Sequence, residues 1–278
     1  MRLPSYQELS KEQDEINDLP LDGNWLVTGP PGTGKTVMAL YRTEMLDEQD
    51  RKVLVLMWSR LLKMYVQEAT EELNLDENQV ANFDAWFKGY WRRHFGGDPP
   101  HFPSSLFDYD WKEIHQVLND EGIPTDTPDF IIDEGQDLPK EFYIFSRELC
   151  DHLTVFADED QRIFETGSNV ETIKLYAGIE ESYELRTNYR NSRQIAEFAQ
   201  DNFYDGPEDL LPDLPSRDGP EPAIKAFDTW KESADQIANH ITNFSDNTVG
   251  VFLPKKSWVK KFAEYLEEKL GADRVQQY

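Results

Sequence analysis

The sequence predicts an α/β protein built around a parallel β-sheet, and three stretches carry this prediction. Trp25 to Thr28 is a short apolar run that leads into a glycine-rich turn and then into an amphipathic segment, Val37 to Leu46, with helical spacing. Lys52 to Trp58 and Phe130 to Ile132 are continuous apolar runs, which are typical of strands buried on both faces of a parallel sheet. Strands that alternate with helical segments in this way indicate βαβ units.

The glycine-rich turn, Gly29 to Thr36, has the spacing GxxxxGK[ST]. A backbone that turns its N–H groups around a phosphate must visit conformations that a Cβ would block, so the pattern needs glycine. Lys35 offers a point charge to the outer phosphates, Thr36 offers a hydroxyl ligand to Mg²⁺, and the following helix adds the partial positive charge of its N-terminus. The stretch therefore predicts a nucleoside triphosphate site, and the alternative of a chance glycine turn is disfavoured by the order strand, loop, helix.

Acidic residues follow two of the other predicted strands. Asp133 and Glu134 end the run that begins at Phe130, at the carboxyl edge where ligands bind in open α/β sheets. We expect Asp133 to hold the water shell of Mg²⁺ and Glu134 to polarise the attacking water. The run Leu153 to Ala157 repeats this layout and leads to Gln161, which either senses the γ-phosphate or is an ordinary loop amide.

Composition limits the class of protein. The chain has 278 residues, of which 29% are charged and 38% are hydrophobic, as in soluble globular proteins. Its apolar runs are too short to span a membrane, and the polar stretch from Met1 to Asp18 shows no secretory signal. The single cysteine, Cys150, excludes an internal disulfide framework and predicts a reducing cytoplasm. The five histidines are scattered, so no His/Cys metal site is expected.

The formal net charge is −26, which disfavours a generally nucleic-acid-binding surface because such surfaces are usually basic. Either a binding groove is local, or the partner is not a nucleic acid; an unusually acidic host proteome would give the same balance. Between Asp84 and Thr127, aromatic residues alternate with basic ones around Trp86 to Phe95. Aromatic rings and cations suit a single-strand platform, but a helix that buries its aromatic face in the core is favoured slightly over it.

The remaining segments complete the predicted order. Ser10 to Ile16 is predicted to be a helix capped by Ser10, in which Gln13 completes the capping box. Residues 59–73 and 192–202 are predicted helices, and residues 80–83 a short strand. Residues 205–222 are rich in Pro, Gly and acids and indicate a linker. Strands at Ala223 to Phe227 and Thr248 to Leu253, with helices at 229–244 and 256–270, predict a second parallel α/β unit.

Taken in order, these segments resemble the UvrD/Rep-like superfamily 1 helicases over essentially the whole chain. GPPGTGKT at Gly29 to Thr36 is similar to motif I, and DEGQD at Asp133 to Asp137 to the DExQD form of motif II. ADEDQRIF at 157–164 is similar to motif III, with Ala157 in place of the usual glycine. NYRN at 188–191 resembles motif IV, and LMWSRLL at 56–62 resembles motif Ia.

The resemblance implies roles for individual residues. Tyr189 would stack on adenine, Arg190 would act as an arginine finger, and Gln13 would read the adenine edge, a role that replaces its capping interpretation. A strand of DNA would meet Trp58, Ser59, Arg60 and Phe164. ATP and Mg²⁺ are the implied ligands. The implied catalytic residues are Lys35, Asp133, Glu134, Gln161 and Arg190; the implied nucleotide-binding residues are Gln13, Gly29, Gly32, Thr33, Gly34, Lys35, Thr36 and Tyr189; and the implied metal ligands are Thr36 and Asp133.

The implied fold is a RecA-like P-loop NTPase sheet with a small helical insertion at about 84–128, followed by part of a second RecA-like domain. The expected domains are residues 1–178 and 179–278. Motif V and motif VI, which supplies a second catalytic arginine, do not follow Tyr278, so we expect an incomplete core in which hydrolysis is slow. Asp84 places a negative charge where the family's motif Ib contacts a strand of DNA.

Three functions are compatible with these features. The first is an ATP-dependent helicase or translocase on single-stranded DNA, with RNA not excluded, whose second domain a partner polypeptide completes. The second is a nucleotide-responsive regulatory module that has lost the motor and binds a partner protein through its acidic surface. The third, a small-molecule kinase, needs the P-loop but neither DExQD nor NYR, so it ranks well below the others.

Overall fold

The computed structural model describes residues 3–58, 73, 75–103, 108–124, 127–158, 167–203, 213–244 and 248–277. The chain divides into two compact units, Met1–Glu221 and Pro222–Tyr278. Among the described residues, no helix is both long enough and apolar enough to cross a membrane.

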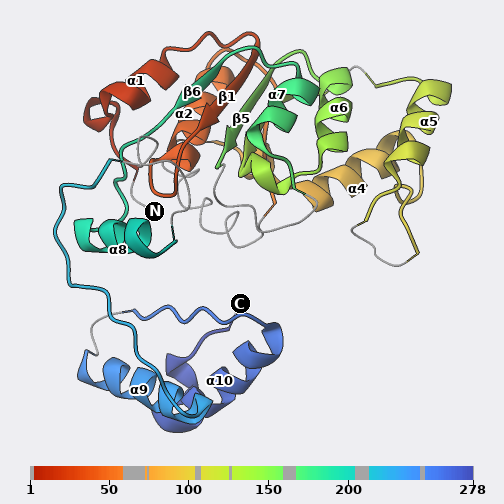
Figure 1. Cartoon of the computed structure of the whole chain (residues 1–278). Coiled ribbons are helices and arrows are strands. Elements are labelled where there is room, and N and C mark those ends of the chain that lie inside the picture. Colours follow the sequence, from red (N-terminus) through yellow and green to blue (C-terminus); the bar gives the residue numbers. More distant parts are fainter. Residues whose placement is uncertain are drawn as a thin grey trace. The chain divides into compact units, whose positions relative to one another are not determined.

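The first unit is organised around a six-stranded sheet in which every strand pair is parallel (Figure 1). From one edge to the other the strands are β3 (Val80–Asn82), β2 (Val53–Met57), β4 (Asp129–Asp133), β5 (Leu153–Ala157), β1 (Asn24–Thr28) and β6 (Ser182–Glu184). The predicted α/β fold with a parallel sheet is therefore confirmed. β6 pairs with β1, so the first sheet extends several residues beyond position 178, where we expected the first domain to end.

Helices cover both faces of this sheet, because alternate strand residues point to opposite sides. Val53, Val55 and Met57 of β2 pack with α1 (Lys11–Asn17) and α2 (Lys35–Asp47), whereas Leu54 and Leu56 pack into the other cluster. That second cluster is formed with α4 (Phe83–His94), α5 (Trp111–Glu121), α6 (Lys140–Leu149) and α7 (Val170–Ala177). Burial on both faces explains why the strand sequences are continuous apolar runs.

The aromatic segment predicted between positions 86 and 95 is core, not a binding platform. Phe87, Tyr90 and Trp91 on α4 are at most 5% exposed, and Trp86 packs edge-on against Phe130 of β4. Arg92 points away from this cluster and pairs with Asp98. The interpretation of this segment as an amphipathic helix facing the core is confirmed.

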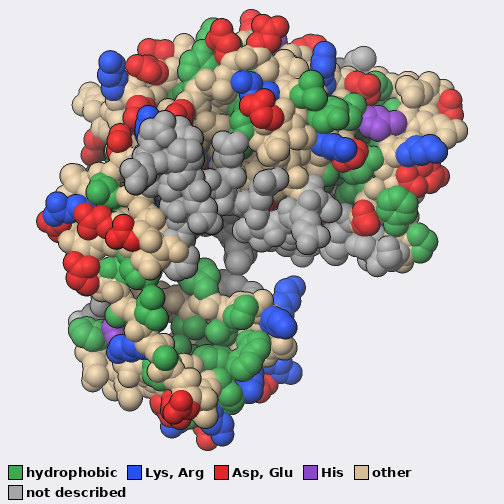
Figure 2. All heavy atoms as spheres, in the orientation of Figure 1, with side chains coloured by type: hydrophobic (Ala, Val, Ile, Leu, Met, Phe, Trp, Pro, Cys, Tyr) green, Lys and Arg blue, Asp and Glu red, His purple; other side chains and the backbone are tan. Residues whose placement is uncertain are grey.

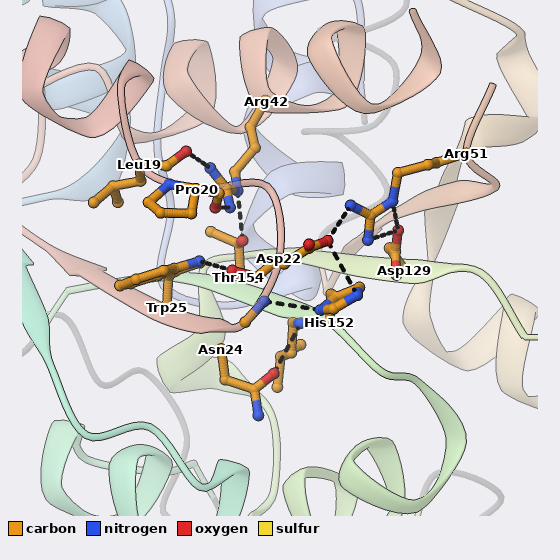
Figure 3. A network of polar contacts seen from close by, with 12 residues as sticks. Leu19, Pro20, Asp22, Asn24, Trp25, Arg42, Arg51, Asp129, His152 and Thr154 are labelled. Carbon is orange, nitrogen blue, oxygen red and sulfur yellow. Dashed lines mark hydrogen bonds and ion pairs between the residues drawn. The ribbon is translucent and has the colours of Figure 1, made fainter. Parts of the chain in front are cut away.

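A polar network connects the amino ends of the strands, at the end of the sheet opposite the glycine loop (Figure 3). The buried Arg42 of α2 donates to the carbonyl oxygens of Leu19 and Pro20 and to Oγ1 of Thr154. Burial, together with the like charge of Arg51, lowers the pKa of Arg42 to about 10. These bonds fix the chain that enters β1 against α2 and β5.

A second group of contacts at this edge is centred on Asp22 (Figure 3). Arg51 forms ion pairs with Asp129 and with Asp22, and His152 Nδ1 accepts the N–H of Gly23 at 2.8 Å. His152 Nε2 lies 3.3 Å from the Asp22 carboxylate. The strand that ends at the glycine loop is therefore anchored at its beginning by side chains from three other elements.

The remaining described elements include one further helix of the first unit and several 3₁₀ turns. α8 (Arg193–Phe203) follows residues 186–191, which we name the NYR segment, and its limits are close to those predicted. The predicted helix at 59–73 falls almost entirely outside the described residues. The 3₁₀ turns are η1 (Tyr6–Glu8), η2 (Glu77–Gln79), η3 (Gly135–Asp137) and η5 (Ala272–Arg274).

The second unit contains α9 (Trp230–Asn243) and α10 (Lys256–Leu270), as predicted. The two strands predicted at 223–227 and 248–253 are wrong, because neither segment forms a strand or pairs with one in the described part of the unit. Ile224 is 78% exposed and Phe252 is 97% exposed. Hydrophobic side chains gather on the face of this unit seen in Figure 2.

Charge is divided unequally between the units. Residues 222–278 carry eight acidic and eight basic side chains, so the whole net charge of −26 belongs to residues 1–221. Self-repulsion of this size destabilises a compact state, and mobile ions screen it.

We therefore expect the melting temperature of the full chain to rise by several degrees between about 0.1 M and about 1 M chloride salt, where the Debye length falls from about 10 Å to about 3 Å. Sodium and potassium chloride should act equally, because screening does not depend on the cation. A melting temperature that falls with added salt would contradict this account.

Candidate functional site

The glycine loop between β1 and α2 adopts the backbone that its sequence predicts. Gly32 and Gly34 have φ values of +89° and +93°, which L side chains rarely adopt. A Cβ on Gly32 would lie 2.5 Å from the Asn188 side chain, and one on Gly34 would lie 2.5 Å from that of Gln13. The loop is thus shaped by its own φ angles and by close neighbours that tolerate no added atom.

Lys35, the first residue of α2, lies under this loop and is 6% exposed. Its Nζ donates to the carbonyl oxygens of Gly29 at 2.5 Å and Pro30 at 3.1 Å, and lies 3.5 Å from Oδ2 of Asp158. A buried ammonium needs such acceptors. Phosphate oxygens are acceptors of the same kind, so a triphosphate in the loop could exchange with them.

Thr36 and Asp133 are in direct contact, although they are 97 positions apart in the sequence. Thr36 Oγ1 donates to Asp133 Oδ2 at 2.8 Å. The Asp133 carboxyl is fully buried, and this burial, together with the negative charge of Glu134, raises its pKa to about 7. A hydroxyl and a carboxylate side by side form a donor set of the hard-oxygen type that Mg²⁺ prefers. The residues predicted as metal ligands therefore fit that ion.

Glu134 is held by its neighbours in an unusual conformation. Its φ is +55°, in the left-handed region that non-glycine residues rarely occupy. Gln136 Nε2 donates to Glu134 Oε2 at 2.8 Å, and Gln136 Oε1 accepts the N–H of Asp158 at 2.9 Å. The buried glutamine thus links the acidic end of β4 to the acidic end of β5 and fixes the direction of the Glu134 carboxylate.

Replacing Gln136 with Ala should therefore reduce ATP turnover about tenfold while changing the affinity for an ATP analogue less than about twofold. The substitution removes the bonds to Glu134 Oε2 and to the Asp158 N–H, but none of the groups expected to bind the phosphates. Single-turnover hydrolysis and analogue titration measure the two effects separately. Gln49→Ala, at an exposed position after α2, is the matched control. A Gln136→Ala protein with normal turnover and weakened binding would show that Gln136 does not orient the Glu134 carboxylate.

Asp137 is the second perturbed carboxyl of this motif. Burial and the charge of Glu134 raise its pKa to about 6. Its Oδ1 is buried and has no hydrogen-bond partner in the part of the chain that the structure describes. Residues 159–166 lie outside the described residues.

The NYR segment lies against the glycine loop. Tyr189 N–H donates to the carbonyl oxygen of Gly32 at 2.8 Å, and the Asn188 side chain accepts the N–H groups of Arg190 and Asn191 at 3.1 Å each. The side chains of Tyr189 and Arg190 are exposed. Arg190 falls within the expected second domain, residues 179–278, but it belongs to the same compact unit as the glycine loop.

Helix α1 contacts both the glycine loop and the start of the NYR segment. Gln13 completes the capping box with Ser10, and its Nε2 also donates to the carbonyl oxygen of Thr33 at 3.1 Å. Glu12 accepts the backbone N–H of Arg186 at 3.0 Å and that of Thr187 at 3.3 Å. The Gln13 amide thus serves both as the cap of α1 and as a contact to the glycine loop, and its role toward adenine stays a prediction.

Other predicted site residues are placed as follows. Trp58 is half-buried and stacks on Phe83, with ring centroids 5.9 Å apart. Gln161, Ser59, Arg60 and Phe164 lie outside the described residues. Sequence reasoning did not select Asp158, Glu12 or Gln136 for the site. Asp158 could have been selected because it directly follows an apolar strand, as Asp133 and Glu134 do. No feature of the sequence pointed to Glu12 as a site residue.

Parallel strands with a glycine loop after β1 and carboxylates after β4 define a RecA-like P-loop NTPase fold. No protein-family model matches the chain. No curated protein matches it either.

Solved helicase structures are similar to it at low identity. Pif1 helicase from Candida albicans is 16% identical with a TM-score of 0.45, and the match covers 87% of this chain and 55% of that one. Bacteroides Pif1 bound to ssDNA is 14% identical with a TM-score of 0.38, covering 73% and 48% respectively. The Pyrococcus furiosus Hef helicase domain is 14% identical with a TM-score of 0.38, covering 95% and 54%. The chain thus spans about half the length of each of these structures.

Proposed function

We propose that this chain is an ATP-dependent DNA helicase or single-strand translocase of the UvrD/Rep type, and that it binds and hydrolyses ATP with Mg²⁺. The contact between Thr36 Oγ1 and Asp133 Oδ2 at 2.8 Å, beside the buried Lys35, carries the proposal. It joins the hydroxyl of the glycine loop to the first acid of DEGQD, the two groups that P-loop NTPases use to hold the metal.

The chain's own residues divide the work. The loop amides and Lys35 bind the β- and γ-phosphates, and Thr36 and Asp133 hold the ion. Bound Mg²⁺ neutralises charge on the transferred phosphoryl group. Glu134, fixed by Gln136, orients the attacking water and accepts its proton. Each of these groups lies at the carboxyl edge of the sheet, where β1 and β4 end.

The NYR segment and α1 supply the remaining contacts of the proposal. Tyr189 is 47% exposed and lies next to Gly32, so its ring is free to stack on a base. Arg190 provides a guanidinium for the γ-phosphate, and Gln161 is proposed to sense the same phosphate. Gln13 reads the adenine edge, and Trp58, Ser59, Arg60 and Phe164 contact the DNA strand.

Single-stranded DNA binding by the full chain tests the motor part of this proposal. A fluorescent oligonucleotide should bind at low salt, with an affinity that an ATP analogue and Mg²⁺ change several-fold, and the DNA should stimulate ATP hydrolysis. Glu134→Gln should keep nucleotide binding and lose hydrolysis. An RNA oligonucleotide of the same sequence distinguishes the two nucleic acids. Absence of both binding and stimulation would leave a nucleotide-binding protein that is not a translocase.

A regulatory, protein-binding module is the second candidate, and charge favours it. All of the net charge lies in residues 1–221, and Asp84 is already engaged by Lys88 at 3.0 Å and by the hydroxyl of Tyr109. A basic protein captured by the full chain in an ATP-dependent and DNA-independent manner would favour this function over the first.

The proposed helicase or translocase function also includes a partner polypeptide that completes the second unit. The segments that contain Ile224 and Phe252 form no strand and expose these apolar side chains, so we propose that a completing segment pairs with them. Val249 and Leu253 line a small cavity of about 120 Å³ with Phe262 and Arg274. Addition of a completing segment should protect the amides of residues 223–227 and 248–253 from hydrogen exchange.

A further inference from the structure

We propose that residues 213–219, which we name the strap, hold Tyr189 and Arg190 against the glycine loop, and that Arg217 and Asp218 are the positioning residues. This inference rests on the proposed function, in which Arg190 and Tyr189 contact the nucleotide. The strap is a second element, outside every sequence motif, and it fixes the positions of these two side chains.

The strap is bonded to the end of the NYR segment. Arg217 Nη2 donates to the carbonyl oxygen of Arg190 at 2.6 Å, and the carbonyl oxygen of Arg217 accepts the N–H of Arg193 at 2.8 Å. A hydrogen bond from a guanidinium is charge-assisted and directional. One residue of the strap therefore holds the backbone on both sides of Asn191 and Ser192.

Other contacts extend along the whole strap. Asp213 N–H donates to the carbonyl oxygen of Arg186 at 3.2 Å, and Asp213 forms a parallel bridge with Thr187. Asp218 accepts from the side chains of Arg193 and Gln194. The strap is thus paired with the NYR segment at its beginning and with the first turn of α8 at its end.

Gly219 closes the contact at that end. Its N–H donates to Gln194 Oε1 at 2.8 Å, and a Cβ at this position would lie 2.6 Å from Cβ of Ser192. The backbone of the strap approaches the cap of α8 so closely that only glycine fits.

The NYR segment transmits this arrangement to the glycine loop. Tyr189 N–H is bonded to Gly32 at 2.8 Å, and a Cβ built on Gly32 would be 2.9 Å from Cβ of Arg190. A continuous series of contacts therefore runs from Gly32 through Tyr189 and Arg190 to Arg217.

Two substitutions with opposite charge effects test the inference. Arg217→Ala removes a positive charge near the phosphate site, whereas Asp218→Ala removes a negative one. If the strap positions Arg190 and Tyr189, both substitutions should weaken binding of an ATP analogue with Mg²⁺ by about threefold to tenfold, because each loses hydrogen bonds to charged groups. If only electrostatic attraction for the nucleotide mattered, Asp218→Ala would bind the analogue more tightly than the wild type.

Hydrogen exchange in the nucleotide-free full chain supplies the second readout. Both substitutions should speed exchange of the amides of Tyr189 and Arg193 by about tenfold and leave those of β4 unchanged. Arg93→Ala, which removes an exposed arginine from α4, is the control for charge and should change neither readout. Arg217→Lys, which keeps a charged donor, should recover part of the protection.

The result for the strap can be distinguished from failure of the proposed nucleotide-binding function. If Lys35→Ala binds the analogue as well as the wild type does, nucleotide binding at this loop is wrong, and the exchange data alone decide on the strap. Unchanged amide exchange in both variants, or tighter nucleotide binding by Asp218→Ala, would overturn the inference.

Discussion

Replacing Lys35 with Ala should weaken binding of an ATP analogue with Mg²⁺ by about 100-fold and abolish detectable hydrolysis. The Lys35 ammonium is buried beneath the glycine loop and pairs with two carbonyl oxygens and with Asp158, so it is already placed among acceptors that phosphate oxygens can replace. Charge-assisted hydrogen bonds contribute about 1.5–3 kcal/mol each, which corresponds to roughly tenfold to 100-fold in affinity.

Titration of a fluorescent ATP analogue measures this effect. Lys112→Ala removes the same charge from an exposed position on α5 and should bind as the wild type does, which separates local contact from a change in net charge. Lys35→Ala also leaves Asp158 buried without this ion pair, so its melting temperature must be recorded. Equal affinity of the folded Lys35→Ala protein and the wild type would show that the loop does not bind the triphosphate.

Replacing Asp133 with Asn should stabilise the nucleotide-free protein at pH 8 and abolish the Mg²⁺-dependent part of nucleotide binding. Burial beside Glu134 raises the pKa of Asp133 to about 7 in the folded chain, from an ordinary value of 3.8. A carboxyl whose pKa is raised by folding contributes its stability below the unfolded value and loses it as the pH rises through the folded value. Ionised Asp133 therefore costs the free protein on the order of 2–4 kcal/mol at pH 8.

The pH dependence makes this prediction specific. The gain in unfolding free energy of Asp133→Asn over the wild type should be largest at pH 8, smaller at pH 5 and smallest at a pH about one unit below the unfolded pKa of 3.8, where the wild-type carboxyl is protonated in both states. Urea unfolding at these three pH values measures it. Asp110→Asn, an N-cap on α5, is the control. A variant that is less stable than the wild type at pH 8 would contradict the assigned burial and charge.

Strands were predicted correctly where both faces are buried, and wrongly where strand formation depends on a neighbouring strand to pair with. The run that became β2 is apolar at every position, that of β4 is apolar between its two aspartates, and that of β5 is apolar except at Thr154. Both faces of these strands are covered, so their sequences alone identify them. Residues 223–227 and 248–253 have the same local composition but no neighbouring strand, so they stay unpaired. β6 is short and polar, and its pairing with β1 depends on tertiary contacts that no local pattern contains.

Site prediction from the sequence was limited in the same way. Motif spacing identified Lys35, Thr36 and Asp133, because the chemistry of phosphate and metal binding requires particular residue types at fixed positions. It did not identify the bond from Gln136 to Glu134, or the contact between the strap and Arg190, because such pairs depend on how the elements pack. The double role of Gln13 shows that a local capping motif can also serve a distant loop.

A crystal structure of the full chain with a non-hydrolysable ATP analogue and Mg²⁺ tests the central claim most directly. It should show the triphosphate in the glycine loop, Lys35 Nζ bonded to phosphate oxygens instead of Gly29, and a metal ion between Thr36 and Asp133. A nucleotide bound elsewhere, with the Thr36–Asp133 hydrogen bond and the Lys35 contacts unchanged, would contradict it.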